Sequence, residues 1–233
     1  MLETRPGELP IPIPRDDGPA LIAHAGGNTV RRVADAIQAG ADFLEVDLWV
    51  HRGRFEARHE RAIYPLPFWF ERWYLRWAPR RPFGLKELFV ETAGRTNVFL
   101  DLKNGSDTAA RLLRRSLDEA HARVQVAASS QLWYVLRQVN ELAPEVALFY
   151  SVDVQAKLDL FLSVSDRDVQ PAGVSCRDSL LSKEKVAMLH DRGLRVVAWT
   201  VDDPDRAEQL ASWGVDGITT HRVAELRERL ARR

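Results

Sequence analysis

Two acidic residues stand inside an otherwise apolar stretch, Phe43-Leu44-Glu45-Val46-Asp47-Leu48. Residues two apart on a β-strand point to the same face, so Glu45 and Asp47 are expected side by side. Buried like charges are costly unless a positive group lies between them. Mg²⁺ and Ca²⁺ bind carboxylate oxygens, so the stretch predicts either a metal site or two separate pairs with Lys or Arg.

Four further residues could complete an acid–base site. Asp101 and Lys103 end a second apolar run that begins at Val98, whereas His24 follows Leu21-Ile22-Ala23 and His59 follows an alternating segment. Histidine can donate or accept a proton near neutral pH. If these residues meet around Glu45 and Asp47, the combination suits metal-assisted acid–base chemistry on an anionic group.

The elements that must position these residues alternate along the whole chain. Apolar runs separate segments of helical period, beginning with a strand at 21–23, a glycine turn capped by Asn28 or Thr29, a helix to about 39 and the strand that carries Glu45. About eight such units occur, and they predict a single (β/α)8 TIM barrel in preference to a doubly wound sheet. A barrel brings the residues at the carboxyl ends of its strands together around one mouth.

The order of these residues resembles the glycerophosphodiester phosphodiesterase family. The resemblance runs from Leu21 to about Arg222 and rests on His24-x-Gly26, Asn28-Thr29, Glu45-x-Asp47, His59, Asp101-x-Lys103, Trp199-Thr200-Val201-Asp202 and Gly214-Val215-Asp216-Gly217-Ile218. It implies a TIM barrel in which His24 and His59 are the general acid and base. It also implies a Mg²⁺ or Ca²⁺ ion on Glu45, Asp47 and Asp101, and substrate or phosphate contacts from Lys103, Trp199 and Asn28.

The reaction implied by the resemblance is hydrolysis of a glycerophosphodiester to sn-glycerol 3-phosphate and an alcohol. Attack by a glycerol hydroxyl would first give a cyclic phosphate, which water would then open. Two alternatives stay open. One is a lysophospholipase D or cyclic-phosphate-forming phospholipase D acting on lysophospholipids, and the other is a phosphate-binding barrel without catalytic activity.

The chain departs from the family pattern at several positions near the predicted site. Ala25 stands where an arginine is usual, which removes a guanidinium that could bind phosphate through two hydrogen bonds. The third carboxylate is Asp101 where Glu is usual, and His221 replaces a frequent Asp after the last strand. We expect the ion and the phosphate to be held differently from the usual pattern, with at most a weak supporting role for His221.

A segment rich in aromatic and arginine residues, 61–82, interrupts the alternation. Trp69, Trp73 and Trp77 recur at about helical spacing, with several arginines among them. This pattern predicts a short helix that packs its aromatic side chains over the barrel mouth as a loop or lid. Trp and Arg also favour the boundary of a lipid layer, so the three tryptophans are an alternative peripheral membrane contact.

Bulk properties narrow the class of protein. The charges of the 33 basic and 33 acidic side chains cancel, so the composition does not indicate general electrostatic binding to nucleic acid. Residues 1–19 hold five prolines and are expected to be an extended lead-in to a barrel domain at 20–233. They lack the pattern of a signal peptide, and the single cysteine, Cys176, is compatible with the cytoplasmic location that we expect.

Overall fold

The computed structural model of the chain describes residues 18–63, 65–71, 73–105, 107–120, 124–165 and 171–231. The predicted lead-in at 1–19 lies outside these residues except for its last two. Among the described residues, no helix is long and apolar enough to cross a lipid bilayer.

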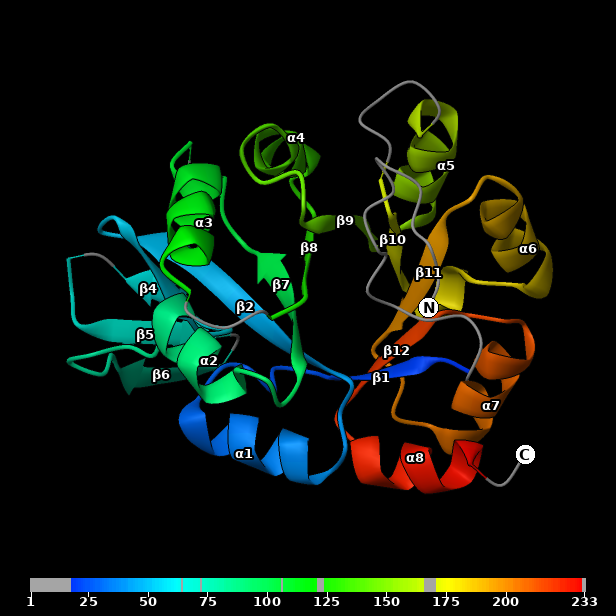
Figure 1. The fold of residues 1–233 in the computed structure, drawn as a ribbon, viewed down its shortest axis with the longest axis horizontal. Coiled ribbons are helices and arrows are strands. Elements are labelled where there is room, and N and C mark those ends of the chain that lie inside the picture. Colours follow the sequence, from blue (N-terminus) through cyan, green and yellow to red (C-terminus); the bar gives the residue numbers. More distant parts are fainter. Residues whose placement is uncertain are drawn as a thin grey trace.

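Eight parallel strands close into a barrel because β1 pairs with both β2 and β12 (Figure 1). The strands are β1 (Ala20–Ala23), β2 (Phe43–His51), β7 (Asn97–Leu102), β8 (Val126–Ser130), β9 (Ala147–Val152), β10 (Gly173–Arg177), β11 (Arg195–Trp199) and β12 (Gly217–Thr220). Each is followed by a helix: α1 (Val30–Gln38), α2 (Leu85–Thr92), α3 (Ala109–Asp118), α4 (Trp133–Leu142), α5 (Gln155–Val164), α6 (Lys183–Asp191), α7 (Pro204–Ser212) and α8 (Val223–Leu230). The predicted TIM barrel is confirmed.

Two separate apolar cores follow from the two faces of the strands. Inside the barrel, Phe43, Phe99 and Phe149 pack with Ile22 and Val197. The intervening residues of the strands, such as Leu44, Val46 and Leu48 of β2, point outward and pack beneath the helices. Since Phe43 faces inward, the alternation of β2 places the two following inward positions at Glu45 and Asp47.

The first helix begins where its capping residue predicts. Thr29 Oγ1 accepts a hydrogen bond from the backbone N–H of Arg32 at 3.2 Å, so Thr29 is the N-cap. The helix buries Val33 and Ala36. The first residue of the helix, Val30, is 51% exposed.

The segment 61–82 contains no helix among its described residues, so the predicted lid helix is wrong. It forms a three-stranded antiparallel sheet beside β2 and α2: β4 (Arg61–Ile63), β5 (Phe68–Glu71) and β6 (Tyr74–Trp77) (Figure 1). Pro65 and Pro67 cannot donate amide hydrogen bonds, which favours a turn before β5. Before it, β3 (Arg54–Ala57) pairs with β2 as an antiparallel hairpin.

Candidate active site

Three carboxylates meet inside the barrel above the phenylalanine layer. Glu45 and Asp47 lie on β2, and Asp101 lies on β7, where it is paired in register with Asp47. One oxygen from each of the three side chains lies within 4.8 Å of the other two. The structure therefore brings together the predicted metal ligands, and it does so through the register of two neighbouring parallel strands.

The turn after β1 holds the two acids of β2 in place. The N–H of Ala25 donates to Glu45 Oε2 at 2.5 Å, and the N–H of Gly27 donates to the carbonyl of Glu45 at 2.8 Å. A Cβ atom at Gly27 would lie 2.7 Å from the Cβ of Val46, so glycine permits this close approach. Asn28 bonds Asp47 twice: its Nδ2 donates to Oδ2 at 2.7 Å, and its Oδ1 accepts from the Asp47 N–H at 2.9 Å.

We expected Asn28 to contact the substrate, but its side-chain amide instead forms hydrogen bonds with Asp47. It is buried, and both ends of its amide are used by Asp47. Asn28 is consequently a support for the carboxylate cluster in this structure. The fixed amide also orients Asp47, because the side chain can rotate only by breaking the hydrogen bond to Oδ2.

Lys103 is the positive partner of the cluster. Its Nζ lies 2.8 Å from Asp47 Oδ1 and also forms an ion pair with Asp101. Burial raises the pKa of Glu45 well above its usual value, and the neighbouring charge of Asp47 adds to that effect. Burial likewise raises the pKa of Asp101, although Lys103 opposes it. One ammonium therefore does not balance three carboxylates, of which Glu45 and Asp47 are buried, and the cluster favours further positive charge.

The donor set fits a hard divalent cation. Ca²⁺ takes oxygen ligands at about 2.3–2.6 Å, so opposite ligands of one ion can lie about 5 Å apart. The 4.8 Å limit on the three carboxylate oxygens is compatible with a shared ion. In addition, Asp47 Oδ1 is fully buried and makes no hydrogen bond, and the ammonium of Lys103 lies 2.8 Å from it as an ion-pair partner.

His24 lies directly after β1 and is linked to the end of β12. Its Nδ1 lies 2.7 Å from Nε2 of His221, whose Nδ1 in turn lies 2.8 Å from Asp202 Oδ2. Burial lowers the pKa of His24 to about 4, with further lowering by His221, Lys103 and His59 against the opposing effect of Asp47. At neutral pH, His24 is therefore an uncharged imidazole that can accept a proton.

His59 lies after β3 and is held by the small sheet. Its Nδ1 lies 2.7 Å from Glu71 Oε1 on β5, and the other oxygen of Glu71 accepts a hydrogen bond from the Tyr74 hydroxyl at 2.7 Å. Hydrogen bonding to Glu71 raises the pKa of Tyr74 to about 12, so the hydroxyl remains a donor. A carboxylate only accepts, so His59 carries a proton on Nδ1 and turns Nε2 away from Glu71.

Two cavities meet at His24. The inner one, about 230 Å³, lies within the barrel mouth and is lined by His24, Glu45, Asp101, Lys103, Ser129 and Trp199. The outer one, about 990 Å³, lies between the barrel and the small sheet and is lined by residues that include both histidines, Glu71 and Tyr74. All the predicted site residues except the buried Asp47 line one or both cavities, and Trp199 lines the inner one.

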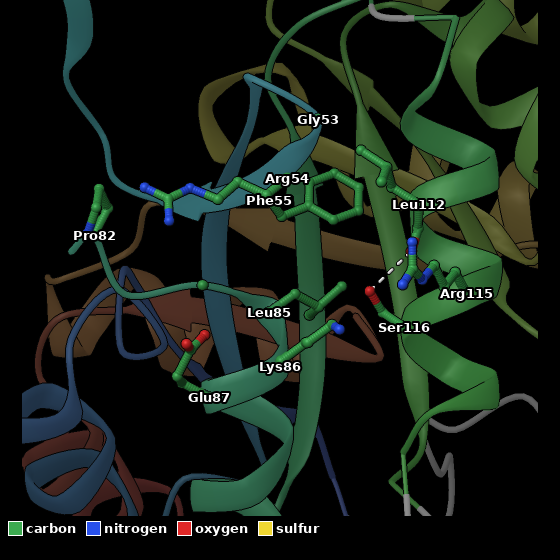
Figure 2. Close-up of a pocket in the computed structure, with 11 residues that line it drawn as sticks. Gly53, Arg54, Phe55, Pro82, Leu85, Lys86, Glu87, Leu112, Arg115 and Ser116 are labelled. Carbon is green, nitrogen blue, oxygen red and sulfur yellow. Dashed lines mark hydrogen bonds between the residues drawn. The ribbon is translucent and has the colours of Figure 1, made fainter.

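A third pocket lies outside the barrel and shares no residue with the predicted site. Figure 2 shows it between α2, α3 and β3, with Arg54, Lys86 and Arg115 around it. These cations are already paired, Lys86 and Arg115 with Glu119 and Arg54 with Glu56. The pocket therefore presents no unpaired cation of its own for an anionic ligand.

Three residues around the histidines were not predicted as site residues. Glu71 lies in the segment expected to be a helix, and Asp202 had been noted only as part of a motif. His221 had been given a weak supporting role. The one sequence signal was that His221 and Ala25 both depart from the family pattern; the structure places His221 against the ring of His24 and the N–H of Ala25 against Glu45.

The sequence of the chain matches the profile of the glycerophosphoryl diester phosphodiesterase family over residues 86–225, more than half of its length. The chain belongs to this family. It is therefore a phosphodiesterase, a hydrolase of phosphoric diesters. The matched range contains Asp101, Lys103, Trp199 and His221, whereas His24, Glu45, Asp47 and His59 precede it. No curated protein sequence matches the chain.

Solved structures of similar proteins share the barrel of this phosphodiesterase. A Silicibacter pomeroyi protein described as a glycerophosphoryl diester phosphodiesterase has a TM-score of 0.79 at 20% identity, over 96% of this chain and 97% of that one. An Oleispira antarctica phosphodiesterase in complex with the product sn-glycerol-3-phosphate has a TM-score of 0.75 at 18% identity, over 92% and 97%. A Parabacteroides distasonis glycerophosphodiester phosphodiesterase has 0.75 at 19%, over 93% and 98%.

Proposed function

We propose that this phosphodiesterase hydrolyses glycerophosphodiesters to sn-glycerol 3-phosphate and an alcohol, with a divalent cation on Glu45, Asp47 and Asp101. The observation that carries the proposal is the buried carboxylate cluster with too little positive charge, open to a cavity that His24 and Lys103 also line. The product bound to the Oleispira antarctica neighbour supports the same substrate class. When bound, the cation would supply a Lewis acid for a phosphate oxygen and lower the pKa of a coordinated hydroxyl.

The surroundings of the two histidines suggest different roles. His24 is uncharged at neutral pH and lines the inner cavity, so we assign it as the base that removes a proton from the attacking glycerol hydroxyl. His59 lines only the outer cavity, so we assign it as the acid that, in its doubly protonated form, transfers the proton on Nε2 to the oxygen of the departing alcohol. Water then opens the cyclic phosphate, with the proton transfers reversed. Lys103 at the inner cavity would bind the phosphate.

The roles assigned to the two histidines predict where each half of the substrate binds. The glycerol phosphate half belongs in the inner cavity, where the acids, Lys103 and the flat ring of Trp199 surround it. The alcohol leaves through the outer cavity, whose walls include Trp69, Tyr74 and Arg76 of the small sheet. The small sheet is therefore the part of the chain expected to select the alcohol.

The reaction can be followed by ³¹P NMR with glycerophosphocholine as substrate. We expect the diester signal to be replaced by that of sn-glycerol 3-phosphate, with a cyclic phosphate at early times. Excess EDTA should stop turnover, and added Mg²⁺ or Ca²⁺ should restore it. An unchanged diester signal from folded protein with either ion would contradict the proposal.

A second candidate substrate class, lysophospholipids, is favoured by the outer face of the small sheet. In antiparallel pairs the residues opposite one another share a face. The register pairs Phe68 with Trp77 and Phe70 with Leu75, and these four side chains form the outer face. Phe70, Leu75 and Trp77 are 43%, 55% and 70% exposed, so an apolar surface lies next to the outer cavity.

The membrane contact we propose includes Trp73 and Trp77 but, unlike the contact predicted from the sequence, does not include Trp69. Trp69 is buried against Arg58 and Arg76 and cannot touch a lipid layer. Trp73 is 96% exposed at the hairpin end and joins the outer face. Residues 61–82 contain five arginines and one acid, a formal charge of +4 in a chain whose net charge is zero. Aromatic side chains flanked by arginines suit the surface of an anionic bilayer.

Vesicle sedimentation tests this contact. We expect the wild type to sediment with vesicles that contain phosphatidylserine, and the Trp73→Ala/Trp77→Ala variant to stay in solution. Its hydrolysis of soluble glycerophosphocholine should be unchanged, because neither tryptophan lines the two cavities of the site. Tyr134→Ala, which removes an exposed aromatic ring from α4, is the control. Equal sedimentation of all three proteins would reject the membrane contact.

A further inference from the structure

A chain of three side chains runs from the proposed base to the rim of the barrel. His24 follows β1, His221 follows β12, and Asp202 lies in the loop between β11 and α7. The distance from His24 Nδ1 to His221 Nε2 is 2.7 Å, and the distance from His221 Nδ1 to Asp202 Oδ2 is 2.8 Å. The two imidazole rings meet nearly at right angles, at 70°, with their centres 4.4 Å apart.

The hydrogen bonds of Asp202 fix the direction of this chain. Its Oδ1 accepts from the backbone N–H of His221 at 2.8 Å and from the hydroxyl of Thr220 at 3.0 Å. These bonds hold Oδ2 toward the ring of His221, and a carboxylate can only accept. The proton between them therefore lies on Nδ1 of His221.

The protons of His221 determine which nitrogen of His24 carries its own proton. When His221 is uncharged with its proton on Nδ1, its Nε2 can only accept, so the proton of the second hydrogen bond belongs to His24 Nδ1. His24 then has its lone pair on Nε2, the nitrogen that does not face His221. Since His24 lines both cavities of the site, this lone pair is free to act on bound substrate.

We propose that His221 and Asp202 are positioning residues of this phosphodiesterase: they hold His24 in the tautomer that has its lone pair on Nε2. This inference rests on the proposed role of His24 as the base. A free imidazole exchanges between two neutral tautomers, and only one of them can accept a proton at Nε2. A group that fixes the tautomer therefore increases the fraction of protein that can react, as the carboxylate does in a Ser-His-Asp triad.

The turn after β1 holds the backbone next to His24. Ala25 has a backbone φ of 51° and no side chain beyond Cβ, and its N–H and carbonyl are used by Glu45 and by Arg32. His24 is thus held on its backbone side by the turn and on its ring side by His221. The position of the ring follows from contacts at three separate parts of the barrel: β2, α1 and the end of β12.

The proposal is tested by ¹⁵N NMR of the imidazole nitrogens together with activity. At neutral pH we expect wild-type His24 to carry its proton on Nδ1. In His221→Ala we expect a mixture of both tautomers and a fall in kcat of roughly 10–100-fold, the usual effect of losing a partner that orients a catalytic group. His221→Gln should recover much of the activity, because the amide can accept from His24 and donate to Asp202.

A matched control separates positioning from stability. His190 contacts Asp216 at 2.9 Å in a second histidine–aspartate pair that lines neither cavity of the site. His190→Gln should leave kcat and the His24 tautomer unchanged. A proton on Nε2 of wild-type His24, or an unchanged tautomer and kcat in folded His221→Ala, would overturn the inference. If the wild type hydrolyses no diester but its His24 carries the proton on Nδ1 as predicted, the proposed function is overturned. The roles of His221 and Asp202 in positioning His24 are then still supported.

Discussion

His24→Ala and His59→Ala are each expected to lower kcat/KM for glycerophosphocholine by roughly two to four orders of magnitude, the usual contribution of a general acid or base. His24 has a lowered pKa and lines the inner cavity, and His59 is oriented by Glu71 at the outer cavity. The two residues serve different steps of proton transfer in our account. Neither variant can therefore be rescued by the histidine that remains.

The pH profile distinguishes the two histidines. Because the pKa of His24 is lowered to about 4, its base form persists as the pH falls from 7, and the loss of activity assigned to His24 should occur near pH 4. A histidine of ordinary pKa would lose its base form near pH 6.5.

His51→Ala, at the end of β2 and outside both cavities, should retain full activity. Full activity of either His24→Ala or His59→Ala would refute its assignment.

Glu45→Gln is expected to abolish metal-dependent stabilisation while leaving the metal-free protein at least as stable as the wild type. The pKa of Glu45 is raised by burial and by Asp47, so at neutral pH the deprotonated form opposes folding. Glutamine removes that charge and keeps an oxygen that can accept from the N–H of Ala25. Thermal unfolding should thus show an equal or higher Tm in EDTA.

The stabilisation by metal should be lost in this variant. A Ca²⁺ or Mg²⁺ ion that binds only the folded state should raise the Tm of the wild type by an amount that increases with its affinity, and loss of a ligand should weaken that affinity by more than about tenfold. Asp216→Asn is the control, since Asp216 is a buried carboxyl bonded to Arg195 and His190 at the other end of the strands. The Asp216→Asn substitution should lower Tm, but metal should shift its Tm as it does in the wild type. An equal metal-induced shift in Glu45→Gln would contradict the proposed ligand set.

The sequence was sufficient for the barrel and for the centre of the site because both depend on strand periodicity. Glu45 and Asp47 are two residues apart on one strand, so their common direction follows from the pleat alone. Asp101 joins them because parallel strands of a barrel end at one mouth, and the register of β2 with β7 places it opposite Asp47. These features require no knowledge of loop conformation.

The parts that sequence reasoning missed depend on contacts between loops. Trp69, Trp73 and Trp77 are spaced as in a helix, yet strand pairing with β6 decides the structure and buries only Trp69 among the three. Glu71 reaches His59 only because of that sheet. Likewise, His221 meets His24 across 197 positions of sequence, through the closure of the barrel between β1 and β12.

The most direct measurement of the central claim is a crystal structure of the protein soaked with Ca²⁺ and sn-glycerol 3-phosphate. We predict one cation on oxygens of Glu45, Asp47 and Asp101, with the phosphate beside Lys103 in the inner cavity and within reach of His24. A cation held elsewhere, or a phosphate bound outside the barrel mouth, would contradict the account.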